Sequence, residues 1–481
     1  MNKLLRASLA LALVAPFGAL ADTQAEIDAL RHEIDAMRAA YEARLQALEQ
    51  RLKASEAAAA TPTAPALTAT PAASTATNAP IAPSAAVAPV VASSSRGANA
   101  FNPSISLILS GLYTRTSRDP ANYAISGFPL STDAETGPGT RGFSLAESEL
   151  GFAASIDPWL RGAASIALHP DDTVSVEEAY IQTTSLGNGF ALKAGRFFSG
   201  IGYLNPQHAH TWDFVDNPLA YQALLGTQYG DDGVRLTWLA PIDQYLELGA
   251  EVGRGRSRSF PGSDSGRNGA GMAALTAHTG GDIGDSHSWR AGVSVLRAKA
   301  NEQSLIATNA AGEQVTNSFT GSTRVWVADA VWKWAPNGNP TRTNFKLQAE
   351  YLRSTRSGSL VHDGGSLVHD GGNVDGAAAD YRAVQSGWYL QGVYQLMPRW
   401  RVGLRTERLN PGTPDYGLNA ESFAGSAFRP RKNTVMVDFN PSEFSRLRLQ
   451  VAQDRSREGL ADNQLFLQYQ TSLGAHGAHS Y

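Results

Sequence analysis

Two histidines separated by one residue form the most distinctive metal-binding pattern of this chain. Residues 207–210 read Gln-His-Ala-His, and an extended His-x-His segment places His208 and His210 on the same face. Imidazole binds zinc, copper or nickel, but a zinc site requires four ligands in all. The pattern predicts a metal site if a carboxylate, such as that of Asp213 or Asp216, converges on the imidazoles. The alternative is a polar loop that folds into a pore.

Histidines recur in two other parts of the chain. The heptapeptide Ser-Leu-Val-His-Asp-Gly-Gly occurs twice in succession over residues 359–372 and presents His362 and His369. Two such copies can hold a cation between them, or they are a duplication in an exposed loop, where added length has little effect on stability. Near the C-terminus, His476 and His479 either bind a cation or only end the chain.

Charged residues in the segments predicted as strands suggest a second kind of chemistry, the selection of ions. A ring of Arg or Lys at a constriction favours anions, whereas a ring of Asp or Glu favours cations. The candidates for lining a pore are Arg196, Arg235, Arg405, Arg408, Glu147 and Glu149. Acidic residues outnumber basic ones in residues 101–481, which argues against strong anion selectivity.

Catalysis has little support in this sequence. The chain contains no cysteine, which excludes disulfides, thiolate metal sites and cysteine nucleophiles. No nucleophile motif such as G-x-S-x-G accompanies the histidines, although His208, His210, Asp213 and Asp216 are the types that hold an activated water. We therefore expect no enzymatic activity.

The region that must position these residues alternates apolar and polar side chains with a period of two. Successive side chains of a strand point to opposite faces, so an alternating run is a strand with one apolar and one polar face. In residues 107–114 and 464–473 the apolar face consists of Leu107, Leu109, Tyr113, Leu465, Leu467, Tyr469 and Leu473.

Cutting residues 101–481 at turn and loop signals predicts sixteen strands. These are 103–116, 141–155, 160–168, 173–184, 189–197, 226–239, 244–253, 270–279, 287–299, 321–335, 341–355, 380–396, 399–410, 430–440, 443–454 and 462–474. An even count with alternating short turns and long loops is typical of an outer-membrane barrel. The long connections are 117–140, 198–225, 254–269, 300–320, 356–379 and 411–429. We expect an all-β fold, an antiparallel transmembrane β-barrel, and the structural alternative is a water-soluble β-sandwich.

A barrel of sixteen strands leaves a water-filled channel. Its polar faces would carry Glu147, Glu149, Glu177, Arg196, Arg235, Glu247, Lys346, Glu350, Arg405 and Glu407. Loop 198–225 is predicted to form the constriction, because it is long and carries residues able to pack against the wall. The constriction candidates are Trp212, Asp213, Phe214 and Asp216.

The first hundred residues divide into three segments. Residues 1–21 have the positive start, apolar run and Ala-Leu-Ala end of a secretory signal peptide. Residues 22–56 show the heptad-like apolar spacing of a short coiled coil. Such a coil would join three chains or space the barrel from the cell wall, and the alternative is a lone amphipathic helix on a surface. Residues 57–100 form an Ala/Pro-rich linker, and residues 101–481 form the barrel.

Several segments resemble a known family of porins. The stretch Ala191-Leu192-Lys193-Ala194-Gly195-Arg196-Phe197-Phe198, and then residues 231–236, are similar to the phosphate-selective porin O/P superfamily. Residues 101–107, 200–205 and 472–479 resemble a proteobacterial subgroup with an N-terminal coil, whose members are sometimes labelled zinc-regulated outer-membrane receptors. The resemblance implies a sixteen-stranded, trimeric porin. It does not extend to phosphate selectivity or to a TonB mechanism, which requires about 22 strands and a plug.

These observations predict a passive outer-membrane porin of a Gram-negative bacterium, with the coil in the periplasm, for small hydrophilic solutes or ions. Uptake or capture of zinc or another metal ion is one alternative, and a structural tether is another. The expected partners are outer-membrane lipid, two further copies of the chain, small solutes or ions, and the cell wall through the coil. No resident cofactor is expected, and the only role considered for Zn²⁺ is that of a transported or regulatory ion. A net charge of −4 implies no nucleic-acid partner.

Overall fold

The computed structural model describes residues 103–184, 186–255, 260, 270–309, 311–362, 366–369, 372–375, 378–423 and 425–474. The chain divides into two compact units, 1–79 and 80–481, and every described residue belongs to the second. The predicted signal peptide, coiled coil and linker lie outside the described residues. Among the described residues, no helix is both long and apolar enough to cross a membrane.

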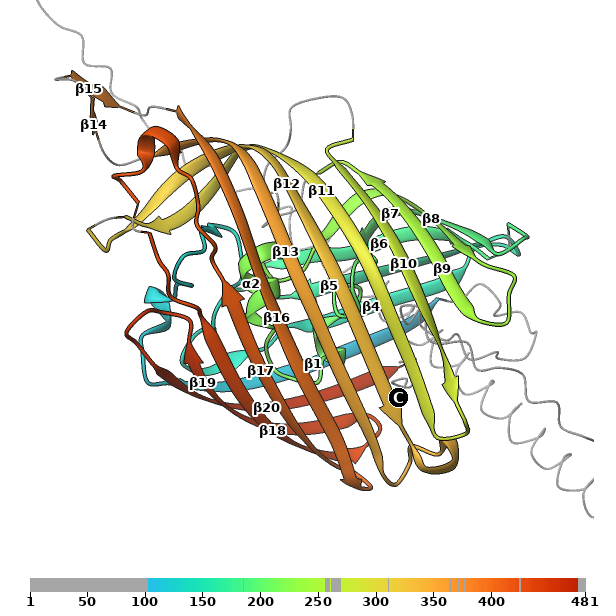
Figure 1. Ribbon diagram of the computed structural model, residues 1–481. Helices are drawn as coiled ribbons and strands as arrows, with labels where there is room; N and C mark the ends of the chain where they lie inside the picture. The colour runs from blue at the N-terminus through green and yellow to red at the C-terminus, as the bar shows by residue number, and fades with distance from the viewer. Residues whose placement is uncertain are drawn as a thin grey trace, which may run out of the picture. The chain divides into compact units, whose positions relative to one another are not determined.

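Sixteen antiparallel strands form a closed barrel within the described residues (Figure 1). They are β1 (Ser104–Thr116), β4 (Ser148–Ser155), β5 (Leu160–Leu168), β6 (Val174–Thr183), β7 (Phe190–Phe198), β8 (Gly230–Leu239), β9 (Tyr245–Gly253), β10 (Met272–Ile283), β11 (His287–Thr308), β12 (Gln314–Trp334), β13 (Asn344–His362), β16 (Ala378–Met397), β17 (Trp400–Asn410), β18 (Arg431–Ser442), β19 (Ser445–Arg455) and β20 (Asp462–Gly474). Each strand pairs with its neighbours in the chain, and β1 pairs with β20 from Ser106–Gly474 to Thr116–Gln464. Because the first and last strands pair, the barrel has no open edge.

Shorter elements complete the described structure. Two short strands, β2 (Leu130–Ser131) and β3 (Gly142–Leu145), pair with β11 and β1, and β14 (Ser366–His369) pairs with β15 (Gly372–Asp375). The single-turn 3-10 helices are η1 (Pro120–Asn122), η2 (Ala209–Thr211), η3 (Pro336–Gly338) and η4 (Gly417–Asn419), and the α-helix is α2 (Leu219–Leu225).

The predicted fold class is confirmed, and each of the sixteen predicted segments overlaps one barrel strand. Two of the predicted loops are wrong in extent. Residues 300–320 are largely occupied by the extended ends of β11 and β12, and residues 356–379 contain the end of β13, the pair β14 and β15, and the first residues of β16. In these ends the backbone ladder continues where the apolar alternation fades, because ladder hydrogen bonds satisfy the main chain whatever the side chains are.

The two faces of the wall differ as the alternation predicts. On β20 the side chains of Leu467 and Tyr469 are each 47% exposed on the outside, whereas Gln468 between them is 8% exposed and points inward. The same pattern recurs on β17 and β19, where Leu404 and Leu449 are exposed and the alternate positions are buried and mostly polar. The outside is therefore apolar and the inside polar, as a membrane barrel requires.

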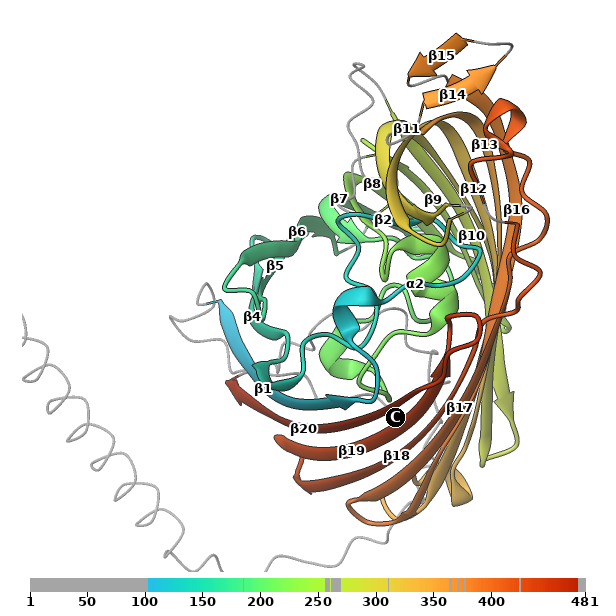
Figure 2. The same ribbon diagram turned by 90° about the vertical axis from the view of Figure 1, so that its left-hand side faces the viewer.

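The segment between β7 and β8, residues 199–229, lies inside the barrel and is called the inner loop below. Figure 2 shows the inner loop and α2 within the ring of strands. All seven residues of α2 are buried, and the helix ends at Gly226, whose φ of 65° is the left-handed conformation that glycine adopts at helix ends. The predicted strand 226–239 therefore begins only at Gly230, and α2 was not predicted.

Candidate functional site

Carboxylates of the barrel wall accept hydrogen bonds from the backbone at the beginning of the inner loop. Glu251 on β9 accepts from the Gly200 amide at 2.8 Å and from the Ser199 hydroxyl at 2.6 Å. Glu350 on β13 accepts from the amides of Tyr203, at 3.2 Å, and Leu204, at 3.0 Å. A loop inside a barrel has no ladder partners, so carboxyl oxygens on the wall satisfy its buried amides and fix its path.

Carboxylates of the wall also hold α2, namely Glu350 and Glu407. The hydroxyl of Tyr221 on α2 donates to Glu350 at 2.8 Å, and that of Tyr389 on β16 donates to the same carboxylate at 2.5 Å. Burial, together with the neighbouring Glu350, raises the pKa of Tyr221, so its hydroxyl stays protonated and remains a donor. At the start of α2, the Leu219 amide donates to Glu407 on β17 at 2.5 Å, which places a carboxylate where the helix has no internal acceptor.

The acidic residue Asp216 anchors the middle of the inner loop to β17–β19. Its Oδ1 accepts hydrogen bonds from Arg405 Nη2 and Gln450 Nε2, both at 2.8 Å, and its Oδ2 accepts one from Lys432 Nζ at 2.5 Å. Arg405 also contacts Glu407 at 2.8 Å. Burial opposes ionisation of Asp216, but Lys432 and Arg405 outweigh it and hold the pKa of Asp216 well below its usual range.

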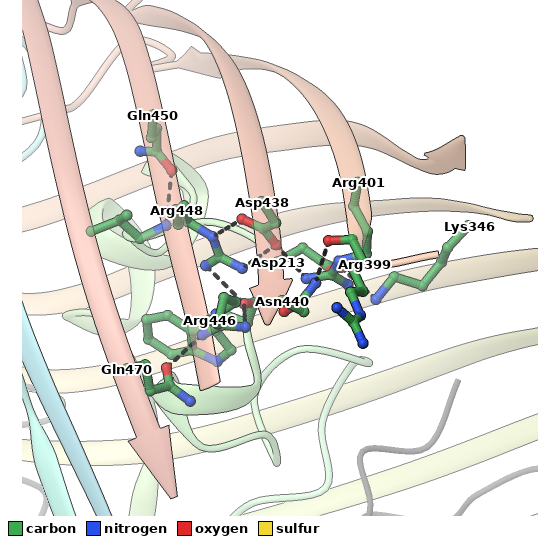
Figure 3. A network of polar contacts seen from close by, with 12 residues as sticks. Asp213, Lys346, Arg399, Arg401, Asp438, Asn440, Arg446, Arg448, Gln450 and Gln470 are labelled. Atoms are coloured by element: carbon green, nitrogen blue, oxygen red, sulfur yellow. Dashed lines mark hydrogen bonds and ion pairs between the residues drawn. The ribbon is translucent and has the colours of Figure 1, made fainter. Parts of the chain in front are cut away.

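A second anchor, Asp213, belongs to a network of basic residues on the same side of the barrel. Asp213 pairs with Lys346 and, at 3.3 Å, with Arg401, and these two cations outweigh burial and lower its pKa. Asp438 binds Arg401 at 2.5 Å and Arg448 at 2.7 Å. Figure 3 shows these side chains pointing toward one another, with Arg446 and Arg399 beside them.

The backbone of the inner loop is also held by this network. Arg448 Nη1 donates to the carbonyl oxygen of Trp212 at 3.0 Å, and Arg446 Nη2 donates to that of His210 at 2.9 Å. The ring of Phe214 is buried against β16 and β18, with the Arg405 guanidinium 4.6 Å from its centre. All four constriction-loop candidates thus lie against the inner wall, with Trp212 7% and Phe214 2% exposed.

Acidic side chains surround His208 on another part of the wall. His208 Nδ1 lies 3.1 Å from Glu177 and 3.3 Å from Glu149, and its Nε2 lies 3.0 Å from Glu178. His210 Nδ1 lies 2.8 Å from Glu149, and the two imidazole rings stack with centroids 5.7 Å apart. Burial disfavours the imidazolium, but the charge of Glu149 and the hydrogen bonds to the three carboxylates raise the pKa of His208 well above its usual value.

The two regions occupy different parts of the wall. In the order of the sixteen strands, the glutamates lie on the second and fourth, β4 and β6, whereas the basic network lies on the eleventh, β13, and on the thirteenth to fifteenth, β17–β19. Within about ten residues the inner loop passes from the glutamates around His208 to the basic network around Asp213 and Asp216. It therefore contacts both an acidic and a basic part of the wall. The two parts meet at His210, whose ring contacts Glu149 and whose carbonyl oxygen accepts a hydrogen bond from Arg446.

Four of the six predicted pore-lining residues fit the interior, and two do not. Arg235 and Arg405 point inward, and they contact Glu247 at 3.3 Å and Glu407 at 2.8 Å, respectively. The carboxylate of Glu149 lies beside His208, and that of Glu147 lies near His169. Arg408 instead lies on the outer face of β17, exposed, three positions from the inward Arg405. An odd spacing on a strand changes the face, so the sequence alone could have excluded one of the two arginines.

The prediction for Arg196 is likewise corrected by its position. Arg196 pairs across the ladder with Asp232. Two residues earlier on the same strand, Ala194 pairs with Val234, which is exposed on the outside, so Arg196 also lies on the outer face. The guanidinium binds the Asp232 carboxylate at 2.7 and 3.1 Å. Lys193, three positions earlier, is the basic residue of β7 that points inward, over the ring of Tyr180.

The other predicted metal ligands are not tested by side-chain geometry. The backbone of His362 ends β13 and that of His369 ends β14, but their side chains are outside the described structure, as are His476 and His479 entirely. Sequence reasoning missed Glu178, Lys432, Asp438, Arg446 and Arg448. The last four occupy alternate inward positions on β18 and β19, so strict alternation would have identified them.

Comparisons with known proteins add a distant relative and several structural likenesses. An uncharacterized protein of Aquifex aeolicus (strain VF5) is 29% identical over 357 residues, which cover 71% of this chain and 70% of that protein. No family model matches the chain, so membership of the phosphate-selective porin superfamily stays a prediction.

Among solved structures, OmpT of Vibrio cholerae in its trimer form has a TM-score of 0.45 at 11% identity, covering 78% of this chain and 100% of that one. The outer-membrane channel DcaP of Acinetobacter baumannii has a TM-score of 0.44 at 14% identity, covering 78% and 99%. An anion-selective porin from Comamonas acidovorans has a TM-score of 0.44 at 10% identity, covering 77% and 99%. The fold is established here by the strand pairing rather than by these likenesses.

Proposed function

We propose that this chain is a porin-type channel of the outer membrane, through which small hydrophilic solutes or ions diffuse passively. The observation that carries the proposal is the closed sixteen-stranded wall with apolar side chains outside and charged side chains inside. A barrel of this size encloses more space than its own wall residues fill. The inner loop narrows that space and is held to the wall by buried ion pairs.

Water reaches charged groups of the interior. The inward side chains of Lys346 and Arg401 are 19% and 23% exposed, although both pair with Asp213. Partly exposed cations beside the inner loop, facing acidic groups across it, are suited to orient a polar solute during passage. Because both signs are present, we do not propose strong selectivity for anions or cations.

Assembly into a homotrimer is part of the proposal. Strands β4–β9 have only 8–10 residues, whereas β11, β12, β13 and β16 have 19–22. At about 3.3 Å per residue the short strands are about 26–33 Å long, and with a tilt of about 40° they cover only about 20–25 Å of a hydrocarbon core of about 30 Å. Apolar residues such as Ile181, 47% exposed, and Phe190, 41% exposed, cover this low wall, which would form the contact between subunits. Residues 22–56 would lie in the periplasm as a coil that joins the three chains or contacts the cell wall.

Single-channel recording of the purified full-length protein in planar bilayers tests the channel. We expect stepwise increases in conductance in KCl, and a reversal potential in a KCl gradient that lies far from the limits of perfect cation or anion selectivity. Heat-modifiable migration on gels confirms that the barrel is folded before each recording. A folded barrel that inserts without conductance steps would overturn the proposal and favour a structural role. Size measurement in detergent checks the trimer independently.

A further inference from the structure

The imidazole of His208 is held at both nitrogens by carboxylates from two strands of the wall. Glu178 Oε2 lies 3.0 Å from Nε2, while Glu177 Oε2 and Glu149 Oε2 lie 3.1 and 3.3 Å from Nδ1. Glu178 is itself fixed, because its Oε1 accepts a hydrogen bond from the Phe198 amide at 3.1 Å. A carboxylate that holds one imidazole nitrogen while the other faces ligand oxygens is the arrangement found around metal-binding histidines.

The arrangement around Nδ1 needs a positive species. When the Nε2 proton is donated to Glu178, the Nδ1 of a neutral imidazole carries a lone pair, which then faces two carboxylate oxygens. Such a contact is repulsive unless a second proton or a metal ion lies between the atoms. Within the described residues no lysine or arginine forms an ion pair with Glu149 or Glu177, the two carboxylates that face Nδ1.

The spacing of these atoms matches the edges of a metal coordination polyhedron. Ligand atoms about 2.0–2.1 Å from a tetrahedral zinc ion are separated by about 3.3 Å, since an edge is about 1.6 times the bond length. The Nδ1–Oε2 distances of 3.1 and 3.3 Å are close to that value, and the three potential ligand atoms all lie within 4.8 Å of one another. His210 contacts the same Glu149 oxygen at 2.8 Å and orients that carboxylate.

We propose that Glu149, Glu177 and His208 bind a divalent transition-metal ion of the Zn²⁺ class on the inner wall of the barrel. The set of one imidazole and two carboxylates suits zinc, cobalt or manganese, with water completing the coordination. Glu178 and His210 act as positioning residues that hold His208 and Glu149. A bound ion would replace the second proton of His208, fasten the inner loop to β4 and β6, and add positive charge beside the constriction.

Binding of Zn²⁺ to the full-length protein in detergent tests the proposal without reference to conductance. After equilibrium dialysis, metal analysis should give one tightly bound zinc ion per chain. Co²⁺ should produce visible absorption bands that Zn²⁺ abolishes. His208→Gln and Glu177→Gln should lose this binding. Glu178→Gln should weaken it about 10–100-fold, as is typical when the partner of a metal-bound histidine is removed.

Two control variants separate this site from other histidines. A variant with His362, His369, His476 and His479 all changed to Gln should retain the ion, and so should His287→Gln, which alters a histidine stacked on Trp332. Loss of binding in the fourfold variant, with retention in His208→Gln, would assign the zinc to the repeat or to the C-terminus and overturn the proposal.

Two further measurements keep the proposal open to refutation. Wild-type protein that binds no Zn²⁺ or Co²⁺ at micromolar concentration would overturn it even if the variants fail to fold. In bilayers, Zn²⁺ should move the reversal potential toward anion preference in the wild type and not in Glu177→Gln. If the barrel binds zinc but does not conduct, the metal site stands and the proposed channel function fails.

Discussion

Changing Asp216 to asparagine keeps the size of the side chain but removes the charge that holds Arg405 and Lys432. These two cations are 1% and 2% exposed, and Asp216 binds them at 2.8 and 2.5 Å. Breaking a buried ion pair from one side leaves an uncompensated charge and costs about 3–5 kcal/mol. Because Arg405 keeps Glu407 at 2.8 Å and Lys432 keeps Asp454 at 3.8 Å, we expect the lower end of that range.

The loss should appear as undocking of the inner loop rather than as unfolding of the barrel, whose ladder is closed without Asp216. A loss of about 3 kcal/mol in docking free energy raises the undocked fraction about 150-fold. The native chain contains no cysteine, so a single thiol can report it. Ala223→Cys places that thiol on α2, at a position that is 7% exposed. Its rate of labelling by a maleimide should follow the undocked population when reclosing is fast.

We expect labelling of Ala223→Cys to become about 100-fold faster when Asp216→Asn is added. Asp243→Asn, in the exposed turn between β8 and β9, is the matched control and should leave the rate unchanged. A change of less than about threefold with Asp216→Asn, in protein shown to be folded by its heat-modifiable migration, would refute the reasoning that buried ion pairs dock the inner loop.

Three further outcomes follow from the structure. Because the pKa of Asp216 is depressed in the docked loop, its stabilisation is present above about pH 3.9 and is lost only as pH falls toward the docked value. The ratio of the Ala223→Cys labelling rates with and without Asp216→Asn should therefore stay constant from pH 7 to about 4, and a change of that ratio within the interval contradicts this. Leu467→Arg lies near the middle of the outer face of β20 and should lower the unfolding free energy of the barrel in lipid vesicles, measured with denaturant, by about 2–4 kcal/mol. Asn463→Arg, at the end of the same face, should lower it by about 0–1 kcal/mol. Equal effects would argue against a lipid-facing belt. Lys346→Gln removes a partly exposed cation of the interior, while Asp213 keeps its ion pair with Arg401. The reversal potential in a KCl gradient should therefore move toward cation preference. An unchanged potential would show that Lys346 lies away from the ion path.

The sequence predicted the strands because side-chain direction on a strand is a local property. In residues 462–474 the alternation alone separates the exposed Leu467 and Tyr469 from the buried polar positions between them. The same rule, applied strictly, would have shown that Arg405 and Arg408 cannot both face the interior. The ends of β11 and β12 escaped prediction because their ladder continues beyond the apolar pattern.

Helix α2 was missed for a different reason. Seven residues are too few for a helix to be stable through propensity alone. It is held instead by contacts that come from distant parts of the chain, namely the Leu219 amide on Glu407 and the Tyr221 hydroxyl on Glu350. No local pattern in residues 219–225 reports such partners.

The residue types needed for a metal site were visible in the sequence at His208 and His210, but their partners were not. Glu149, Glu177 and Glu178 reach His208 only because the barrel closes and the inner loop turns back across its interior. Alternation along each strand therefore determined which side chains face lipid and which face inward. Contacts between residues far apart in the chain decided which inward charges meet, because loop closure and strand order, not local spacing, set those distances.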